Sequence, residues 1–451
     1  MSLNPDVEDA DADAIEVVGT IGAVEPSVGA AAATEAAAAA APGFRSRALN
    51  LSDPFRRAQF AIAALFCFLG FQYATWESRL PAIKSKLGLT DADVGLLLMA
   101  CGIGAAASFP LVGMLMRRLG SRRLATVSGL CLVVILLALS VAPDYPVALI
   151  IVCCDGVAVG CLNVAMNAQG AALEAQYQRA TMGRLHATFS GGALLGALVA
   201  SGASAATPTL AVHFGVAAVV LVLLIAYAQP GMLMQDRKPD EEPNEEPSNK
   251  EQASAAPKRK RLRSLTLPTR ITLWMGLAMA FGTVVEGAMN DWSALYMKDV
   301  AKVAAELAPM GIAVVSVMMV LARTCADSWR TRWGDARLVR VGSALAGTGL
   351  ALALLLGGVV PALIGFACIG LGVAAVTPCV YVAAARQGSD ALTLVAAMGT
   401  TGLLLGPAVI GFIANATSLV WGMAAVAASA FIVSLCSTQI RWAALKDGGA
   451  G

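Results

Sequence analysis

Charged residues are scarce in this chain. Asp, Glu, Lys and Arg make up 14% of its 451 residues, whereas soluble globular proteins contain about 25%. This deficit excludes an ordinary soluble protein. The 32 basic and 30 acidic residues nearly balance, so the chain has neither the basic field expected for nucleic-acid binding nor the acidic excess typical of disorder.

Several nucleotide-binding, metal-binding and catalytic motifs are also missing. The chain has no GxxxxGK[ST] phosphate-binding loop, which argues against a built-in ATPase as its energy source. It has no clustered His, Cys and Glu set and no nucleophile elbow, so we expect no metal, no cofactor and no enzyme. The 10 cysteines lie within or at the ends of apolar stretches without CxxC spacing, which favours a packing role.

Long apolar stretches take the place of charge, with 57% of the residues hydrophobic. A helix crosses a membrane with about 20 apolar residues, and six such stretches precede a polar break while six follow it. They lie near 58–79, 93–116, 124–142, 146–169, 187–206, 208–228, 270–297, 308–328, 338–357, 361–384, 391–414 and 418–440. The sequence predicts an all-α membrane protein of twelve transmembrane helices in two six-helix bundles.

Polar segments divide the chain into five parts. Residues 1–57 are polar and then alanine-rich, which predicts a disordered tail. Residues 229–269 are acidic and proline-rich and then basic, so they predict a solvated linker. The bundles are expected at 58–228 and 270–440, and residues 441–451 form a second polar tail.

The placement of Lys and Arg predicts the orientation. With both termini on one side, 27 of the 32 basic residues fall on that side and five on the other. Basic loops stay in the cytoplasm. We therefore expect a multi-pass protein of the cytoplasmic (inner) membrane with both termini inside.

The two halves of the chain resemble each other at an offset near 214 residues. The matching landmarks are Trp76 and Trp292, Gly120 and Gly334, and the runs Gly192–Gly196 and Gly402–Gly406. Together they indicate a duplicated six-helix unit, the arrangement in which transporters place a substrate site between the repeats near the membrane midplane.

The loop between the second and third stretches reads Gly113-Met-Leu-Met-Arg117-Arg118-Leu-Gly120-Ser-Arg122-Arg123. It resembles the gating motif of the major facilitator superfamily, with Arg117 where that family usually has Asp. The copy in the second half, from Arg323 to Gly334, retains an acid at Asp327. The resemblance implies a gating set of Gly113, Arg117, Arg118, Gly120, Arg122, Arg323, Asp327 and Arg332.

More specific strings are similar to a bacterial inner-membrane branch of that family, the YbjJ-like proteins, which are distantly similar to fucose permeases. These strings lie at 76–83, 163–170, 183–187 and 286–292. The resemblance implies a secondary transporter of a small solute that alternates between inward-open and outward-open states.

Acids inside the membrane are the first candidates for mechanism, because a charge at the bilayer centre costs about 2.5–3.5 kcal/mol on insertion scales. Asp155 lies about 13 Å into its helix and Glu286 about 24 Å into its own, from the rise of 1.5 Å per residue. Asp155 either accepts a proton in the central cavity or pairs with a neighbouring helix. Glu286, with Asn290 one turn later, is either a proton site or part of an outer gate. Asp291 is closer to water, which favours an interface or a gate.

Polar residues of the first stretch lie at helical spacing. Gln72, Trp76 and Arg79 share one face, which either lines the cavity or, for Trp76 and Arg79, anchors the helix at the membrane interface. Glu77 is expected to form an ion pair with Arg79.

On the fourth stretch, Asn163 and Asn167 share a face, where they either contact the solute and the inner gate or hydrogen-bond helix to helix. The fifth stretch lacks the Gly-Pro motif common in drug-exporting relatives, which disfavours drug/proton antiport and leaves the transport direction open.

The sequence as a whole predicts a proton-coupled secondary transporter. Its expected partners are a small polar molecule, protons and membrane lipid, with no nucleic acid, and we expect a monomer. The alternatives are a proton-driven drug or metabolite exporter, a channel, and a non-transporting sensor on the same fold.

Overall fold

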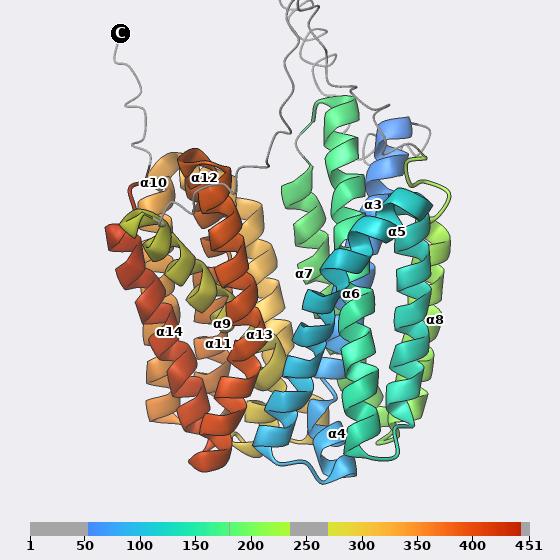
Figure 1. Cartoon of the computed structure of the whole chain (residues 1–451). Coiled ribbons are helices and arrows are strands. Elements are labelled where there is room, and N and C mark those ends of the chain that lie inside the picture. Colours follow the sequence, from blue (N-terminus) through green and yellow to red (C-terminus); the bar gives the residue numbers. More distant parts are fainter. Residues whose placement is uncertain (1–52, 180, 235–268, 443–451) are drawn as a thin grey trace, which may run out of the picture. The chain divides into compact units, whose positions relative to one another are not determined.

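The computed structural model describes residues 53–179, 181–234 and 269–442, and their regular structure is entirely helical. Residues 1–52, most of the expected linker and residues 443–451 lie outside the described residues. The helices of the first half are α3 (Pro54–Glu77), α4 (Leu80–Leu87), α5 (Asp91–Ser140), α6 (Tyr145–Tyr177), α7 (Met182–Ala206) and α8 (Leu210–Ala228) (Figure 1). Those of the second half are α9 (Arg270–Asp299), the short 3₁₀ helix η1 (Ala305–Leu307), α10 (Met310–Leu356), α11 (Val359–Val373), α12 (Val376–Gln387), α13 (Ser389–Ala416) and α14 (Leu419–Gln439).

The described residues contain the predicted twelve transmembrane helices. Eleven segments are long and apolar enough to cross a membrane, and one of them, Asp91–Ser140, has 50 residues and contains two spans. Helix α10 also carries two spans, and α11 and α12 together make one. The all-α fold of two six-helix bundles is therefore confirmed.

Glycine breaks each of the two long helices at an equivalent place. Within α5, Gly120 has φ 73° and ψ 165°, and within α10, Gly334 has φ 77° and ψ 155°. Residues with a side chain rarely adopt this backbone conformation. Both glycines were landmarks of the predicted repeat, and each turns the chain between two membrane spans.

Glycines also allow helices of each half to approach closely in the same way. A Cβ at Gly192 of α7 would clash with the carbonyl oxygen of Cys67 on α3, and one at Gly402 of α13 would clash with that of Ala280 on α9. A second equivalent pair of contacts joins α6 to the first span of α5 in one half, and α11 to the first span of α10 in the other. In that pair a Cβ at Gly156 would meet the Cys101 oxygen, and one at Gly370 the Val315 oxygen.

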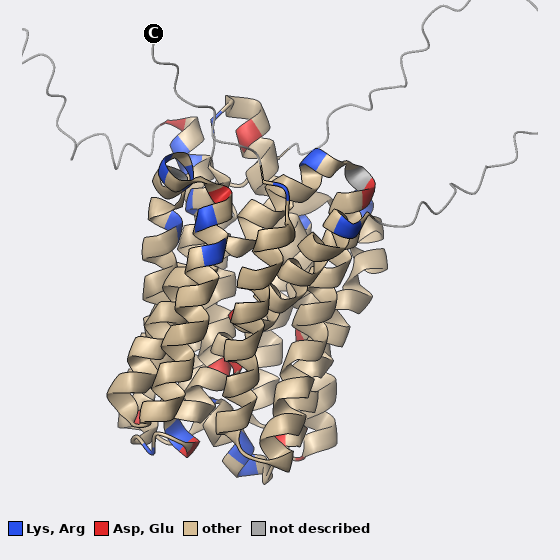
Figure 2. Cartoon of the chain, turned by 90° about the vertical axis from the view of Figure 1, so that its left-hand side faces the viewer, with Lys and Arg blue, Asp and Glu red and all other residues tan. Residues whose placement is uncertain are grey.

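The halves contact each other crosswise, because α5 packs against α13 and α7 packs against α10. Helices α5 and α13 meet at two glycines, where a Cβ at Gly95 would lie 2.9 Å from the carbonyl oxygen of Pro407 and one at Gly411 would lie 2.7 Å from that of Asp91. We call the end where α5 begins and α13 ends the Gly95 end. The opposite end, at Gly120 and Gly334, is called the basic end, because most Lys and Arg of the described residues lie there (Figure 2).

Some helix boundaries differ from the predicted ones. Helix α3 begins at Pro54 rather than residue 58 and ends at Glu77 rather than residue 79. A tight turn follows it, in which the N–H of Arg79 donates to the Trp76 carbonyl, and α4 then begins at Leu80. The proline at the start of α4 and the left-handed Gly88 after it suit a short separate helix.

Candidate functional site

Two polar residues predicted separately meet inside the first half. The Gln72 side chain of α3 donates through Nε2 to Oδ1 of Asp155 on α6 over 2.8 Å. Gln72 is fully buried, Asp155 is 4% exposed, and Sγ of Cys101 lies 4.0 Å from the other carboxylate oxygen. The hydrogen bond fixes the Asp155 side chain, and Gln72 Oε1 has no partner among the described residues.

Two further carboxyl groups lie near Asp155. Glu77 at the end of α3 is 4% exposed and Asp291 on α9 is 8% exposed. The carboxyl group of Glu77 interacts electrostatically with those of Asp291 and Asp155. None of the three forms an ion pair with a described residue. We call Glu77, Asp155 and Asp291 the acid cluster. It draws on both halves, because α3 and α6 belong to the first and α9 to the second.

Arg79 does not pair with Glu77, which corrects the expected boundary ion pair. Its guanidinium donates to Oγ of Ser204 and, over 2.9 Å, to the carbonyl of Pro208, at the end of α7 and in the loop that follows. Because α3 ends at Glu77, Arg79 leaves the helical face that Gln72 and Trp76 share. Trp76 is 2% exposed, and its Nε1 has no partner in the described part of the chain.

A second charged group lies where α7, α9 and α10 meet. Nη2 of Arg323 on α10 lies 2.8 Å from Oε1 of Glu286 on α9, and Nη1 donates over 2.5 Å to Oγ of Ser190 on α7. His186 of α7 interacts electrostatically with both charged residues. Arg323 therefore connects the halves, and Glu286 has a cationic partner, unlike the acid cluster.

The Gly95 end holds a third charged group, which we call the latch. Nζ of Lys84 on α4 lies 2.6 Å from Oδ1 of Asp91 at the start of α5 and 2.7 Å from Oδ2 of Asp299 at the end of α9. Asp91 belongs to the same half as Lys84 and Asp299 to the other. Burial lowers the pKa of Lys84, but the hydrogen bonds and charges of Asp299 and Asp91 outweigh it, so the pKa is raised above the ordinary 10.5.

The remaining predicted polar residues lie on α6 and α9. Asn167 donates through Nδ2 to the backbone and side-chain oxygens of Asn163, over 2.8 Å each, so the two amides pair along one helix. Asn290 is partly buried on α9.

The predicted gating set lies at the basic end, except for Arg323. Gly113, Arg117, Arg118 and Arg332 are exposed, and Arg122 contacts Sδ of Met234. Asp327 lies within α10, and its side chain is outside the described part of the structure.

Sequence reasoning missed two residues that these groups contain, Glu77 and Lys84, and a third, Gln169, that forms a separate polar contact. Glu77 was assigned to an interfacial ion pair, and Lys84 carried no motif. Gln169 of α6 donates through Nε2 to Ser121 Oγ over 2.6 Å and to the Leu233 carbonyl over 3.1 Å, and its Oε1 accepts from the Leu233 N–H. A carboxylate in an apolar segment was the one available signal for Glu77. Among the described residues, no group of three or more His, Cys, Asp or Glu is arranged to hold a metal ion.

Comparison of the sequence with known proteins identifies its family. The model of the Major Facilitator Superfamily matches residues 20–173 and 60–389. The chain belongs to the Major Facilitator Superfamily. It is 32% identical to the uncharacterized transporter y4wD of Sinorhizobium fredii, over 82% of this chain and 93% of that one. It is 30% identical to an uncharacterized MFS-type transporter of Yersinia pestis, over 80% of this chain and 90% of that one.

Solved structures agree on the fold. The crystal structure of the nucleoside transporter NupG aligns with a TM-score of 0.63 and 12% sequence identity, covering 86% of this chain and 98% of that one.

A third relative by sequence is the membrane protein MosC of Rhizobium meliloti, which is 28% identical over 84% of this chain and 88% of its own length. The chain is therefore a multi-pass membrane transporter of this superfamily.

Proposed function

We propose that this chain is a proton-coupled secondary transporter that moves a small polar solute by alternating access between its two halves. The observation that carries the proposal is the acid cluster. Three buried carboxyl groups from both halves interact without an ion pair to a described residue. Ionisation of all three carboxyl groups at once is costly, because burial and the repulsion between like charges both oppose it.

The cluster is suited to coupling because its members lie on helices of different halves. In our proposal a proton is bound while the halves hold Asp291 close to Glu77 and Asp155. Separation of the halves weakens the repulsion and allows the proton to leave. Gln72 assists, because its Nε2 donates to Asp155 and stabilises the ionised form of that carboxylate.

Glu286 has a different role in this proposal. Its carboxylate is held by Arg323, which also reaches Ser190 on the other half. A solute with a charged or strongly polar group would compete for this pair. We propose that Arg323, Glu286, Asn290 and the face of Gln72 and Trp76 line the solute pathway, and that Asn163 and Asn167 serve its inner end.

The contacts at the Gly95 end support an outward-closed state. The latch joins Lys84 to Asp299 across the halves, and Ser201 of α7 donates over 2.5 Å to the carbonyl of Glu306 in η1. From the distribution of Lys and Arg we propose that the basic end faces the cytoplasm, with both termini inside and the protein in the inner membrane.

Ligand screening followed by flux tests the proposal. Thermal shifts of the purified chain with sugars, organic acids, amino-acid derivatives, nucleosides and antibiotics would identify a solute. Uptake into proteoliposomes is then measured with and without an imposed pH gradient. We expect Asp155→Asn and Glu77→Gln to abolish gradient-driven accumulation, because neither side chain can bind and release a proton.

Solute exchange without a pH gradient is the control, because exchange requires the solute pathway and no net proton movement. The Asp155→Asn variant is expected to retain it. Accumulation unchanged in both variants would contradict proton coupling through the acid cluster, and a steady conductance in a planar bilayer would instead favour a channel.

A further inference from the structure

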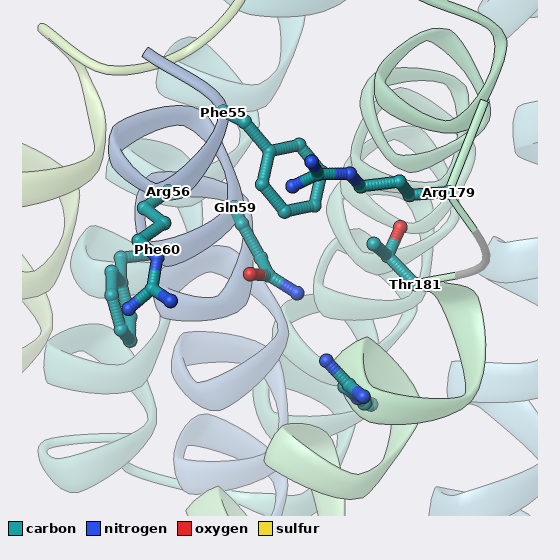
Figure 3. Close-up of a pocket in the computed structure, with 7 residues that line it drawn as sticks. Phe55, Arg56, Gln59, Phe60, Arg179 and Thr181 are labelled. Atoms are coloured by element: carbon teal, nitrogen blue, oxygen red, sulfur yellow. The ribbon is translucent and has the colours of Figure 1, made fainter. Parts of the chain in front are cut away.

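A pocket of about 480 Å³ lies at the basic end, apart from the groups described above. It is bounded by the start of α3, the residues after α6 and the start of α7 (Figure 3). Three arginines line it, Arg56 on α3, Arg179 after α6 and Arg184 on α7. The guanidinium carbon of Arg179 lies 4.8 Å from the centre of the Phe55 ring, which holds that cation at the pocket wall.

A buried hydroxyl in the same wall lacks a partner. Thr181 lines the pocket, is 2% exposed, and its Oγ1 has no hydrogen-bond partner among the described residues. Two backbone donors beside it are already used, because Glu174 accepts from the N–H groups of Thr181 and Met182 over 2.5 and 2.7 Å.

These groups suit a phosphate. Guanidinium groups bind phosphate oxygens through paired hydrogen bonds, and a hydroxyl donates to a further oxygen. We propose that this pocket binds the phosphate of an anionic phospholipid in the leaflet at the basic end of the protein.

Phe60 favours a lipid over a soluble phosphate compound. It lines the pocket, is 37% exposed, and lies on α3, which is a membrane span. It follows Pro54 by about 9 Å along the helix, from the rise of 1.5 Å per residue. The arginines therefore lie at headgroup level while the pocket continues to an apolar ring that an acyl chain can cover.

Native mass spectrometry of the full chain tests the site. The purified protein is titrated with phosphatidylglycerol or, separately, phosphatidylcholine, and bound lipid is counted. We expect preferential binding of phosphatidylglycerol. The double variant Arg179→Gln, Arg184→Gln should lose roughly fivefold in affinity for each arginine. Thr181→Val, which keeps the side-chain shape, should lose roughly tenfold because one hydrogen bond to a charged group is removed.

Arg386→Gln is the matched control, since Arg386 is an exposed arginine in the last turn of α12 at the same end. It should bind phosphatidylglycerol as the unaltered chain does. Size-exclusion profiles and melting temperatures establish that each variant is folded, and Thr181→Val serves as the independent test if the double variant is not.

Three outcomes would overturn the proposal. The first is equal binding of the two lipids by the unaltered chain. The second is that the double variant and Thr181→Val both still bind phosphatidylglycerol. The third is that glycerol 3-phosphate binds in a way that depends on Arg179 and Arg184, while phosphatidylglycerol does not bind. The last result would assign the pocket to a soluble anion.

Discussion

Substitution of Asp299 tests how the Gly95 end is held closed. Lys84 Nζ lies 2.7 Å from Asp299 across the halves and 2.6 Å from Asp91 within its own half. Asp299→Asn removes the crossing charge pair and leaves the other intact. We expect the outward-open state to become more populated, because one of the attractions that oppose opening is lost.

The size of this effect follows from exposure. The side chains of Lys84 and Asp299 are 22% and 38% exposed, so solvent screens the pair, and partly exposed pairs contribute about 0.2–1 kcal/mol. The open population should therefore rise about 1.4- to 5-fold. Lys84→Met should have a larger effect, because it also leaves two carboxylates close together.

Hydrogen–deuterium exchange of the protein in detergent measures this change. When closing is faster than exchange, the exchange rate of a protected amide is proportional to the open population. We expect faster exchange at the Gly95 ends of α5 and α13. Raising the salt from about 0.1 M to about 1 M should accelerate exchange in the unaltered chain and have less effect on Asp299→Asn, because salt screens exposed pairs.

Asp91→Asn is the matched control, because it removes a Lys84 partner within the same half. Equal acceleration of exchange by Asp91→Asn and Asp299→Asn, or no acceleration by Asp299→Asn, would refute the argument.

The contribution of Lys84 to the stability of the closed state should not depend on pH near neutrality. Its folded pKa is raised, so the stabilisation is complete below 10.5 and is lost only as pH rises through the raised value.

The remaining predictions concern helix packing. Gly192→Val should lower the melting temperature, because overpacking costs about 1–3 kcal/mol and the new Cβ would meet the Cys67 carbonyl, whereas Gly191→Val, with open space around its Cβ position, should change it little. Gly334 has φ 77° and ψ 155°, a region that is essentially restricted to glycine, so Gly334→Ala should destabilise the fold by about 1–3 kcal/mol. This is measured as a lower melting temperature than that of Gly183→Ala. Equal melting temperatures within either pair would contradict the packing described.

The sequence predicted the span pattern well, because twenty apolar residues in a row admit few other structures. It also found Gly120 and Gly334, since a glycine between basic residues marked both loops. The sequence did not predict that helix continues almost to each glycine on both sides. In α5 and in α10 a single residue with positive φ turns the chain between two spans.

Side-chain partners were predicted less well. Gln72 and Asp155 were both candidates, but they lie 83 residues apart, and their contact depends on how α3 and α6 pack. Glu77 and Arg79 are close in sequence, yet the turn after α3 sends them in different directions. Arg323 was assigned to a loop motif, whereas it lies inside the bundle beside Glu286. Spacing along one helix predicts a shared face, but the packing of other helices decides what that face contacts.

The equivalence of Gly156 and Gly370 bears on how the two repeats diverged. Asp155 precedes the first of these glycines, and Ile369, a buried apolar residue, precedes the second. The same helix crossing thus carries an acid in one copy and a hydrocarbon in the other. Because backbone contacts at glycine maintain the crossing, the neighbouring position is free to change its chemistry. The two copies preserve one architecture, and only the first carries a titratable group at this position.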